Sequence, residues 1–318
     1  MVRALTPDAA AVIAERYGLG RPHGPPAYAA RGELGRIWRL DTDLGAWAVK
    51  EALVPVDEAA AAADVAFQEA AAAAGVPLPA PVRARDGRVL LSGTDAGAPA
   101  YALRVYAWVD LDPDATVTGA ELGAVAARLH GVGHPVSGPV ADWFAAPLGR
   151  AGWAAFAARL DSAPLWRWLP QLVALDELVE PPDPGQVRIC HRDLNVENVR
   201  RRAGAGVVVL DWENSGPCQP ARELAAILAD LPTAEAVSAY AAYRAAGGPA
   251  EVTGPADFST AIAAQGHLLD FYGRRATDPA ASEEDRARAH ARLATMLVRP
   301  LTEASMTDLL GALADATQ

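Results

Sequence analysis

Cysteine and lysine are both scarce in this chain of 318 residues, and each scarcity narrows what the protein can be. Cys190 and Cys218 are the only cysteines, too few and too far apart for a disulfide framework or a cysteine-held metal cluster. This usage agrees with a reducing compartment, and we expect any bound metal to have oxygen ligands. Lys50 is the only lysine, since every other basic side chain is Arg or His.

Long apolar runs and an excess of positive charge are also missing. No uncharged apolar stretch of about 18 residues occurs, so no membrane span is predicted. The N-terminal segment has Thr6 as a helix cap followed by Pro7, which is typical of an amphipathic helix and not of a secretion signal, so we expect a cytoplasmic protein. The net charge of -11 argues against nucleic acid as a partner. It fits an acidic cleft that attracts cations, or solubility alone.

What is present is ordinary for a globular protein of one large or two medium domains, with 51% hydrophobic and 21% charged residues. In residues 28–53, short apolar runs separated by glycine-containing turns predict three antiparallel strands. The Ala-rich segment 57–74 begins with a capping Asp and predicts a helix. Residues 81–93 predict a hairpin that turns at Asp86-Gly87, and residues 100–112 predict a further strand.

The second part of the chain is mostly helical. Helical periodicity fills residues 119–132, 152–179, 221–231, 234–247 and 257–313. Two short apolar strands, in 187–190 and 207–213, interrupt the helices and flank a polar loop. We therefore predict an α+β protein, with a small sheet domain in 1–107 and a helical domain in 108–318.

The polar loop carries the chemistry. It reads His191-Arg192-Asp193, with Asn198 five positions after the Asp, and Asp211 follows the next apolar run. Phosphoryl transfer from a nucleotide needs a carboxylate for the acceptor hydroxyl and oxygen ligands for Mg²⁺. Asp193 fits the first task, and Asn198 and Asp211 fit the second. The alternative is that these residues only form turns or cap the next segment.

Phosphoryl transfer also needs a cation for the remaining phosphates. Lys50 ends the predicted strand AWAVK, and lysine is a compact charge that can reach two phosphates. The alternative is an exposed residue at a strand end, but a single lysine in a chain that otherwise uses arginine favours the functional interpretation.

At this point the chain resembles the aminoglycoside phosphotransferase and choline kinase group of small-molecule kinases. The resemblance covers residues 28–230, in the order AVK, GVPLPAPV, ALRVYAWVD, RLH, HRDLNVEN and LDWEN. It implies a bilobal protein-kinase-like fold, with a small antiparallel sheet lobe that contains one helix and a larger, mostly helical lobe. It also implies ATP and Mg²⁺ as cofactors.

The resemblance also implies roles for single residues. Asp193 would be the catalytic base, Asn198 and Asp211 the Mg²⁺ ligands, and Lys50 the partner of the α and β phosphates. The backbone from Tyr106 to Val109, which includes Trp108, would bond the adenine.

The sequence departs from the family pattern in the phosphate-covering loop, RGELGRIW, which has only Gly32 and Gly35. Backbone amides there could still meet phosphate oxygens. The acidic partner of Lys50 in the predicted helix is either Asp64 or Glu69, with Asp64 favoured.

Four further residues near the motif have expected roles. His191 would brace the loop by hydrogen bonds, and Arg192 would pair with an acid such as Glu213. We expect His130 to have a packing role. Glu223 stands where the family usually has Asp, and we expect it to form one half of an ion pair beneath the site.

The sequence predicts an ATP-dependent small-molecule kinase. We expect the acceptor to be a small molecule with a hydroxyl group, and a positively charged one if the cleft is acidic. An aminoglycoside or similar antibiotic, or an amino alcohol, would fit. An antibiotic as acceptor would make this a resistance enzyme. A nucleotide-binding pseudokinase or interaction protein remains the alternative. A serine or cysteine hydrolase is disfavoured, because no G-x-S-x-G motif is present. The oligomeric state is not predicted.

Overall fold

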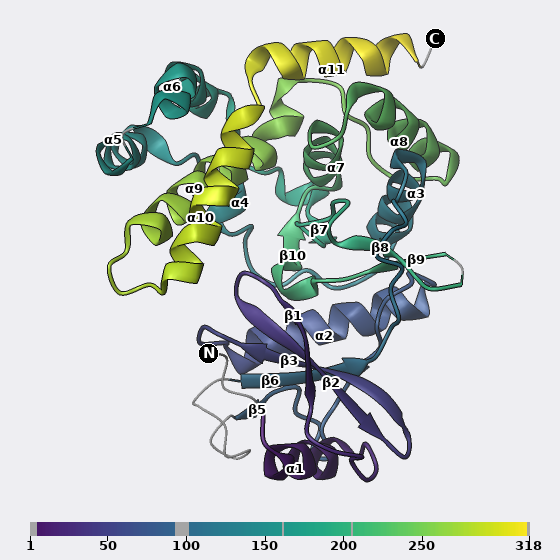
Figure 1. The fold of residues 1–318 in the computed structure, drawn as a ribbon. Helices are drawn as coiled ribbons and strands as arrows, with labels where there is room; N and C mark the ends of the chain where they lie inside the picture. The colour runs from purple at the N-terminus through teal and green to yellow at the C-terminus, as the bar shows by residue number, and fades with distance from the viewer. Residues whose placement is uncertain (1–4, 93–101, 161, 205, 317–318) are drawn as a thin grey trace. The chain divides into compact units, whose positions relative to one another are not determined.

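The computed structural model describes residues 5–92, 102–160, 162–204 and 206–316, and Figure 1 shows its elements. The chain forms two compact units. The first spans Met1–Val117 and Val196–Ser215, and the second Thr118–Asn195 and Gly216–Gln318. We predicted one boundary between residues 107 and 108. The structure places the first division between Val117 and Thr118, and it divides the chain twice more because residues 196–215 join the sheet unit.

The elements of each unit are as follows. The first unit contains α1 (Pro7–Tyr17), β1 (Ala27–Arg31), β2 (Gly35–Thr42), β3 (Gly45–Ala52), α2 (Glu58–Ala73), β4 (Pro81–Val82), β5 (Leu91–Ser92), β6 (Ala102–Ala107), β8 (Val199–Arg201) and β9 (Val207–Val209). The second contains α3 (Gly119–His130), α4 (Asp142–Ala145), α5 (Gly149–Arg159), α6 (Ala163–Leu175), β7 (Arg188–Cys190), β10 (Gly216–Cys218), α7 (Pro220–Ala229), α8 (Thr233–Ala245), α9 (Ser259–Thr277), α10 (Glu283–Val298) and α11 (Glu303–Asp315).

The sheet of the first unit is antiparallel, in the order β1-β2-β3-β6-β4, with β5 also paired to β6. The three predicted strands in 28–53 are confirmed, as is the turn at Gly87, whose φ of 85° suits glycine. The predicted hairpin is wrong in its pairing, because β4 and β5 both bond to β6 and not to each other. Residues 93, 100 and 101 of these predictions lie outside the described residues.

The two faces of this sheet have different roles. Alternate residues of β2, β3 and β6 pack with α1 in one apolar core, which includes Trp38, Val49 and Leu103. The intervening residues, Lys50 and Arg104 among them, point to the other face because side chains alternate along a strand. Figure 1 shows α1 and α2 on opposite sides of the sheet. The chemically important face of β3 is therefore the one on the side of α2.

The predicted helix starts are confirmed in this unit. The Thr6 hydroxyl accepts from the Ala9 amide at 3.1 Å, and the Asp57 carboxylate accepts from the Ala60 amide at 2.8 Å. Each bond satisfies an amide that the first turn of a helix leaves without a partner.

The second unit is mostly helical around one short strand pair. Strand β7 pairs with β10, and in the first unit β8 pairs with β9. Both predicted strands around the polar loop exist, but each bonds to a strand that we did not predict. Helix α3 lies against α8 so closely that a Cβ on Gly123 would be 1.9 Å from the Ala239 carbonyl oxygen. In the part of the chain that the structure describes, no helix combines the length and the hydropathy needed to cross a membrane.

Candidate nucleotide and phosphoryl-transfer site

Lys50 forms the centre of an ion-pair cluster in the first unit. Its Nζ lies 2.7 Å from Asp211 Oδ1 and 2.6 Å from Glu213 Oε2. Strand β3 carries the lysine, and the turn after β9 carries both acids, so residues 161 positions apart in the chain form one cluster. The sequence predicted Lys50 and Asp211 as members of one site, and the structure brings them together.

The predicted acidic partner of Lys50 is corrected. Asp64 Oδ2 pairs with Arg104 Nη1 at 3.2 Å, and both side chains are buried. Glu69 forms an ion pair with Arg83 at 2.7 Å on the surface. Counting along α2 identified the face of the helix correctly, but that face meets the arginine of β6, while the lysine of β3 is held by acids from the turn after β9.

Glu213 is the residue of this cluster that the sequence reasoning missed. It was considered only as a partner for Arg192, although its position two residues after Asp211 was a usable signal. The Arg192 guanidinium lies 4.3 Å from the ring centroid of Phe144, and its pairing with an acid such as Glu213 stays a prediction. Glu213 therefore supplies the carboxylate that was sought for Lys50 in the helix.

The protonation states of Lys50, Asp211 and Glu213 depend on one another and on burial. Burial would lower the pKa of Lys50, but Glu213 and Asp211 beside it raise that pKa above its ordinary value. Burial would raise the pKa of Asp211, but a hydrogen bond from Glu213 and the Lys50 charge hold it well below its usual range. Burial raises the pKa of Glu213, and Asp211 adds to that effect although Lys50 opposes it. Asp211 is therefore ionised at neutral pH and can act as an oxygen ligand.

Asn198 lies beside Asp211 because of the β8–β9 pairing. The amide of Leu210, the residue before Asp211, donates to the Asn198 carbonyl at 2.7 Å. On the other side, the Trp212 indole donates to the Val209 carbonyl at 3.0 Å. The two predicted metal ligands therefore sit at the same end of one short hairpin, on either side of a fixed backbone bond.

The backbone is strained at two points of the motifs. Among the described residues other than glycine, only Arg192 and Asp211 have positive φ, at 64° and 60°. Such a conformation costs an L-residue about 1–2 kcal/mol and persists only where neighbours enforce it. It concentrates at functional sites, so both outliers support a functional interpretation of the two motifs.

The predicted phosphate-covering loop is the turn between β1 and β2. The Gly32 amide donates to the Gly35 carbonyl at 2.9 Å. A Cβ on Gly35 would lie 3.1 Å from the Glu51 carbonyl oxygen and 3.3 Å from Lys50 Cε. A side chain at position 35 would therefore crowd the lysine, so the absence of one leaves space beside Lys50.

Two residues of the predicted adenine segment lie at the end of the sheet, Tyr106 within β6 and Trp108 just after it. Burial and the nearby Glu213 charge raise the pKa of Tyr106 to about 12, so its hydroxyl is neutral. The Trp108 indole donates to Asp110 at 2.8 Å, and its backbone amide donates to the Ala46 carbonyl at 3.1 Å. That amide is therefore engaged within the protein, and adenine binding by this segment stays a prediction.

Asp193 belongs to the second unit, in the loop after β7. It is half-buried, and its Oδ1 accepts from the Asn195 side-chain amide at 3.0 Å. The preceding residue, Arg192, is held from below because its backbone amide donates to Glu223 Oε1. Asp193 is therefore partly accessible at the end of a loop whose backbone is fixed by α7.

A buried network continues from Glu223. His130 Nε2 lies 2.7 Å from Glu223 Oε2, and His130 Nδ1 lies 2.9 Å from the Tyr243 hydroxyl. Burial would raise the pKa of Glu223, but the hydrogen bond and charge of His130 lower it. Glu223 therefore has a buried partner, and that partner is His130. We expected His130 only to pack, but both of its ring nitrogens are hydrogen-bonded. Cys190 lies within 4.8 Å of the ligand atoms of both, but the two His130 nitrogens are already hydrogen-bonded.

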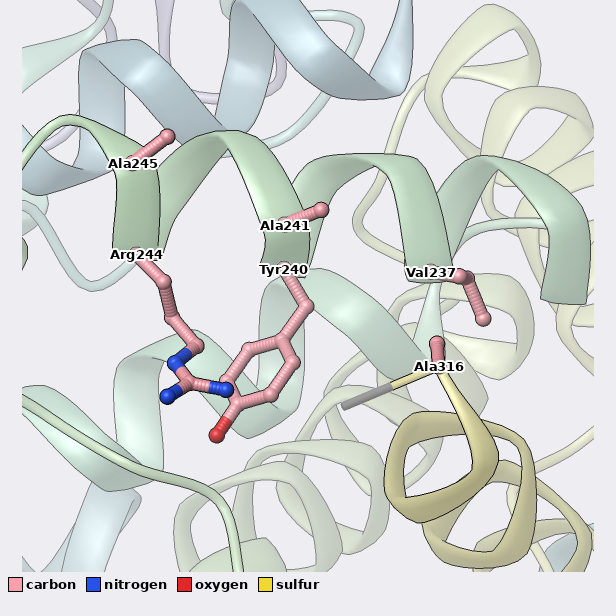
Figure 2. A pocket seen from close by; sticks show the side chains of 6 residues that line it. All are labelled: Val237, Tyr240, Ala241, Arg244, Ala245 and Ala316. Atoms are coloured by element: carbon pink, nitrogen blue, oxygen red, sulfur yellow. The ribbon is translucent and has the colours of Figure 1, made fainter. Parts of the chain in front are cut away.

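A surface hollow of about 370 Å³ lies elsewhere in the second unit, along α8. Figure 2 shows that Tyr240, Arg244 and Ala316 line it, together with three small residues. None of the predicted site residues contributes to it.

Residues 29–258 match the model of the phosphotransferase enzyme family, which covers most of the chain. The chain belongs to this family. The resemblance found in the sequence is thereby confirmed, and the protein is an enzyme that acts on small molecules as a phosphotransferase.

Solved structures of phosphotransferases confirm the fold. A spectinomycin phosphotransferase, in complex with ADP and spectinomycin, has a TM-score of 0.68 at 13% identity over 99% of both chains. An amicoumacin kinase, in complex with AMP-PNP and Ca²⁺, has a TM-score of 0.60 at 14% identity over 90% of both chains. A choline/ethanolamine kinase family protein from Mesorhizobium loti has a TM-score of 0.54 at 19% identity, covering 96% of this chain and 98% of its own. No curated protein matches the chain in sequence.

Proposed function

We propose that this phosphotransferase uses ATP and Mg²⁺ to phosphorylate a hydroxyl group of an amine-bearing small molecule, either an aminosugar-type antibiotic or an amino alcohol. The observation that carries the proposal is the Lys50–Asp211 pair at 2.7 Å, with Asn198 on the same hairpin. It unites one lysine cation with two oxygen donors, which is the set that a nucleoside triphosphate with its metal ion requires.

The nucleotide side of the reaction falls to the first unit. Lys50 holds the α and β phosphates, and the backbone of the Gly32–Gly35 turn covers them. Without nucleotide the lysine is neutralised by Asp211 and Glu213, so phosphate oxygens must replace these carboxylates. The two carboxylates keep Lys50 charged and positioned before nucleotide binds, which lowers the cost of organising the site.

The donor set fits a divalent cation that prefers oxygen. The Asp211 carboxylate is ionised and its side chain is 49% exposed, and Asn198 offers an amide oxygen. When bound there, Mg²⁺ would neutralise the charge on the β and γ phosphates. These residues supply two protein ligands, which agrees with the tendency of Mg²⁺ to keep water and phosphate in its remaining positions.

Asp193 orients the acceptor hydroxyl and accepts its proton. The transferred phosphoryl group passes through a loose transition state, so positioning contributes more than the basicity of the carboxylate. The Asn195 side-chain amide donates to one oxygen of Asp193, which orients the carboxylate.

The solved relatives support this acceptor class. One is named for spectinomycin and another for amicoumacin, and a further one is a microcompartment-associated aminopropanol kinase. If the acceptor is an antibiotic, the enzyme works in the cytoplasm as a resistance determinant, and expression in a susceptible bacterium would raise the inhibitory concentration of that drug.

ADP release measured on a panel of aminoglycosides, peptide antibiotics, choline and aminopropanol tests the proposal. Asp193→Asn keeps the shape of the side chain, and we expect it to lower kcat at least about a hundredfold while nucleotide affinity is retained. Asp308→Asn, on the exposed side of α11, is the matched control. Full activity of Asp193→Asn, or failure of the wild-type enzyme to bind ATP with Mg²⁺, would contradict the proposal.

A further inference from the structure

The surface hollow along α8 contains a polar side chain that has no partner inside the protein. Tyr240 lines the hollow, and this residue is only 6% exposed. Within the part of the chain that the structure describes, the Tyr240 hydroxyl makes no hydrogen bond, and its oxygen is not closed off from solvent. A phenol that is buried to this extent usually has a hydrogen-bond partner. The Tyr240 hydroxyl is therefore available to a ligand that enters the hollow.

Arg244 supplies the charge of the hollow. It lies four residues after Tyr240 on α8, so the two side chains share one face of the helix. Figure 2 shows the Arg244 guanidinium beside the Tyr240 ring, and its carbon lies 5.9 Å from the ring centroid. Arg244 is exposed, and it forms no ion pair with any residue that the structure describes. The hollow thus combines a guanidinium, which has five N–H donors, with a phenol O–H that has no acceptor.

The remaining walls of the hollow are apolar. Val237, Ala241 and Ala245 come from α8, and Ala316 comes from the residue after α11. Because valine and alanine side chains offer no hydrogen bonds, these walls suit hydrocarbon better than a fully polar ligand. The volume of about 370 Å³ lies near the lower end of the range for small-molecule sites. A small ligand with one anionic group and an apolar body matches these walls and their two polar groups.

We propose that this hollow is a second binding site, which takes a small organic carboxylate with an apolar ring or branched chain. Arg244 pairs with the carboxylate, the Tyr240 hydroxyl donates to one of its oxygens, and the apolar body lies against the small side chains of α8. One cation balances a monoanion, whereas a phosphate ester carries nearly two negative charges. Asp315, the residue before Ala316, is exposed, and its negative charge opposes a dianion further. No residue of the proposed phosphoryl-transfer site lines the hollow, so the inference does not depend on the proposed function.

Binding can be measured without turnover by titration in saturation-transfer NMR. The probes are cinnamate and cinnamamide, which have nearly the same shape but differ in charge, and Mg-ADP is present throughout to keep them out of the nucleotide site. We expect cinnamate to bind at least about fivefold more tightly than the amide. Arg244→Gln removes the charge and should abolish this preference. Tyr240→Phe keeps the ring and should weaken cinnamate binding about three- to tenfold.

Two further variants separate binding in the hollow from binding elsewhere. Ala241→Phe fills the hollow but keeps Tyr240 and Arg244, and it should abolish the binding of both probes. Arg21→Gln is the matched control, because Arg21 is also an exposed arginine but belongs to the first unit, and it should leave cinnamate binding unchanged.

Three results would overturn the inference. The first is equal affinity of the wild-type protein for the two probes. The second is a preference that survives in Arg244→Gln, or unchanged cinnamate binding by an Ala241→Phe variant that melts like the wild type, because the probe would then lie elsewhere. The third is full competition by an equal concentration of inorganic phosphate, because the hollow would then accept any anion and the apolar walls would contribute nothing.

Discussion

Removal of the Asp64 carboxylate should destabilise the protein by leaving Arg104 buried without its nearest carboxylate. The Arg104 side chain is 8% exposed and that of Asp64 is 9% exposed, so neither charge is solvated when its partner is lost. Breaking a buried ion pair from one side typically costs about 3–5 kcal/mol. Glu213 lies 4.0 Å from Arg104 and compensates in part, which places the expected loss for Asp64→Ala near the lower end, about 3 kcal/mol.

The same reasoning predicts that a second substitution restores the stability. In Asp64→Leu combined with Arg104→Met, no charge is left buried, and apolar replacements of a buried pair are often neutral or stabilising. Urea and thermal unfolding of the two single variants and the double variant measure the coupling directly. Glu69→Ala is the control, because the Glu69–Arg83 pair is exposed and should contribute less than about 1 kcal/mol.

A double variant as unstable as Asp64→Ala would refute this account. It would mean that Asp64 acts mainly on some other group, Lys50 included. The KM for ATP gives a second check, since a pairing of Asp64 with Lys50 would make that KM rise in the double variant as much as in the single one.

Three further predictions concern the second unit. Glu223→Gln should lose one of the two charge-assisted bonds to His130 and to the Arg192 amide, which lowers the free energy of unfolding by about 2 kcal/mol and lowers kcat. Gly123→Ala should cost about 1–3 kcal/mol in a denaturant melt, because its Cβ would meet the Ala239 backbone, and an unchanged midpoint would contradict the close helix contact. Arg192→Gly should be more stable than Arg192→Ala by about 1 kcal/mol, the reverse of the usual order, because φ is positive there.

Much of the site was predictable from the sequence because its parts are marked by residue type. A single lysine, and an acid that follows an apolar run, remain visible without any structure, and Lys50 and Asp211 do meet. The partner of Lys50 was not predictable in the same way. Helical spacing shows which residues share a face, but whether Asp64 meets the cation of β3 or that of the neighbouring β6 depends on the lateral placement of α2 over the sheet.

The fold, like the site, was predictable in some parts and not in others. Segments with a clear period, such as α1, α2 and the β2–β3 hairpin, were predicted within a few residues. The strands around the polar loop have three residues each, which is too short for alternation to identify their partners. Strand β7 pairs with β10 and strand β9 pairs with β8, and these pairings could be seen only in the structure.

Backbone strain is a feature of this site that no pattern of residues in the sequence predicts. Both Arg192 and Asp211 carry side chains in a conformation that glycine would adopt at lower cost, so in each case the side chain must provide something that offsets the strain. The Arg192 guanidinium covers the Phe144 ring, and the Asp211 carboxylate binds Lys50. The strain is thus located at the residue next to Asp193 in one unit and at the proposed metal ligand in the other. A rigid, over-determined backbone at these two positions is what phosphoryl transfer requires, because its catalysis depends on holding the reacting groups in place.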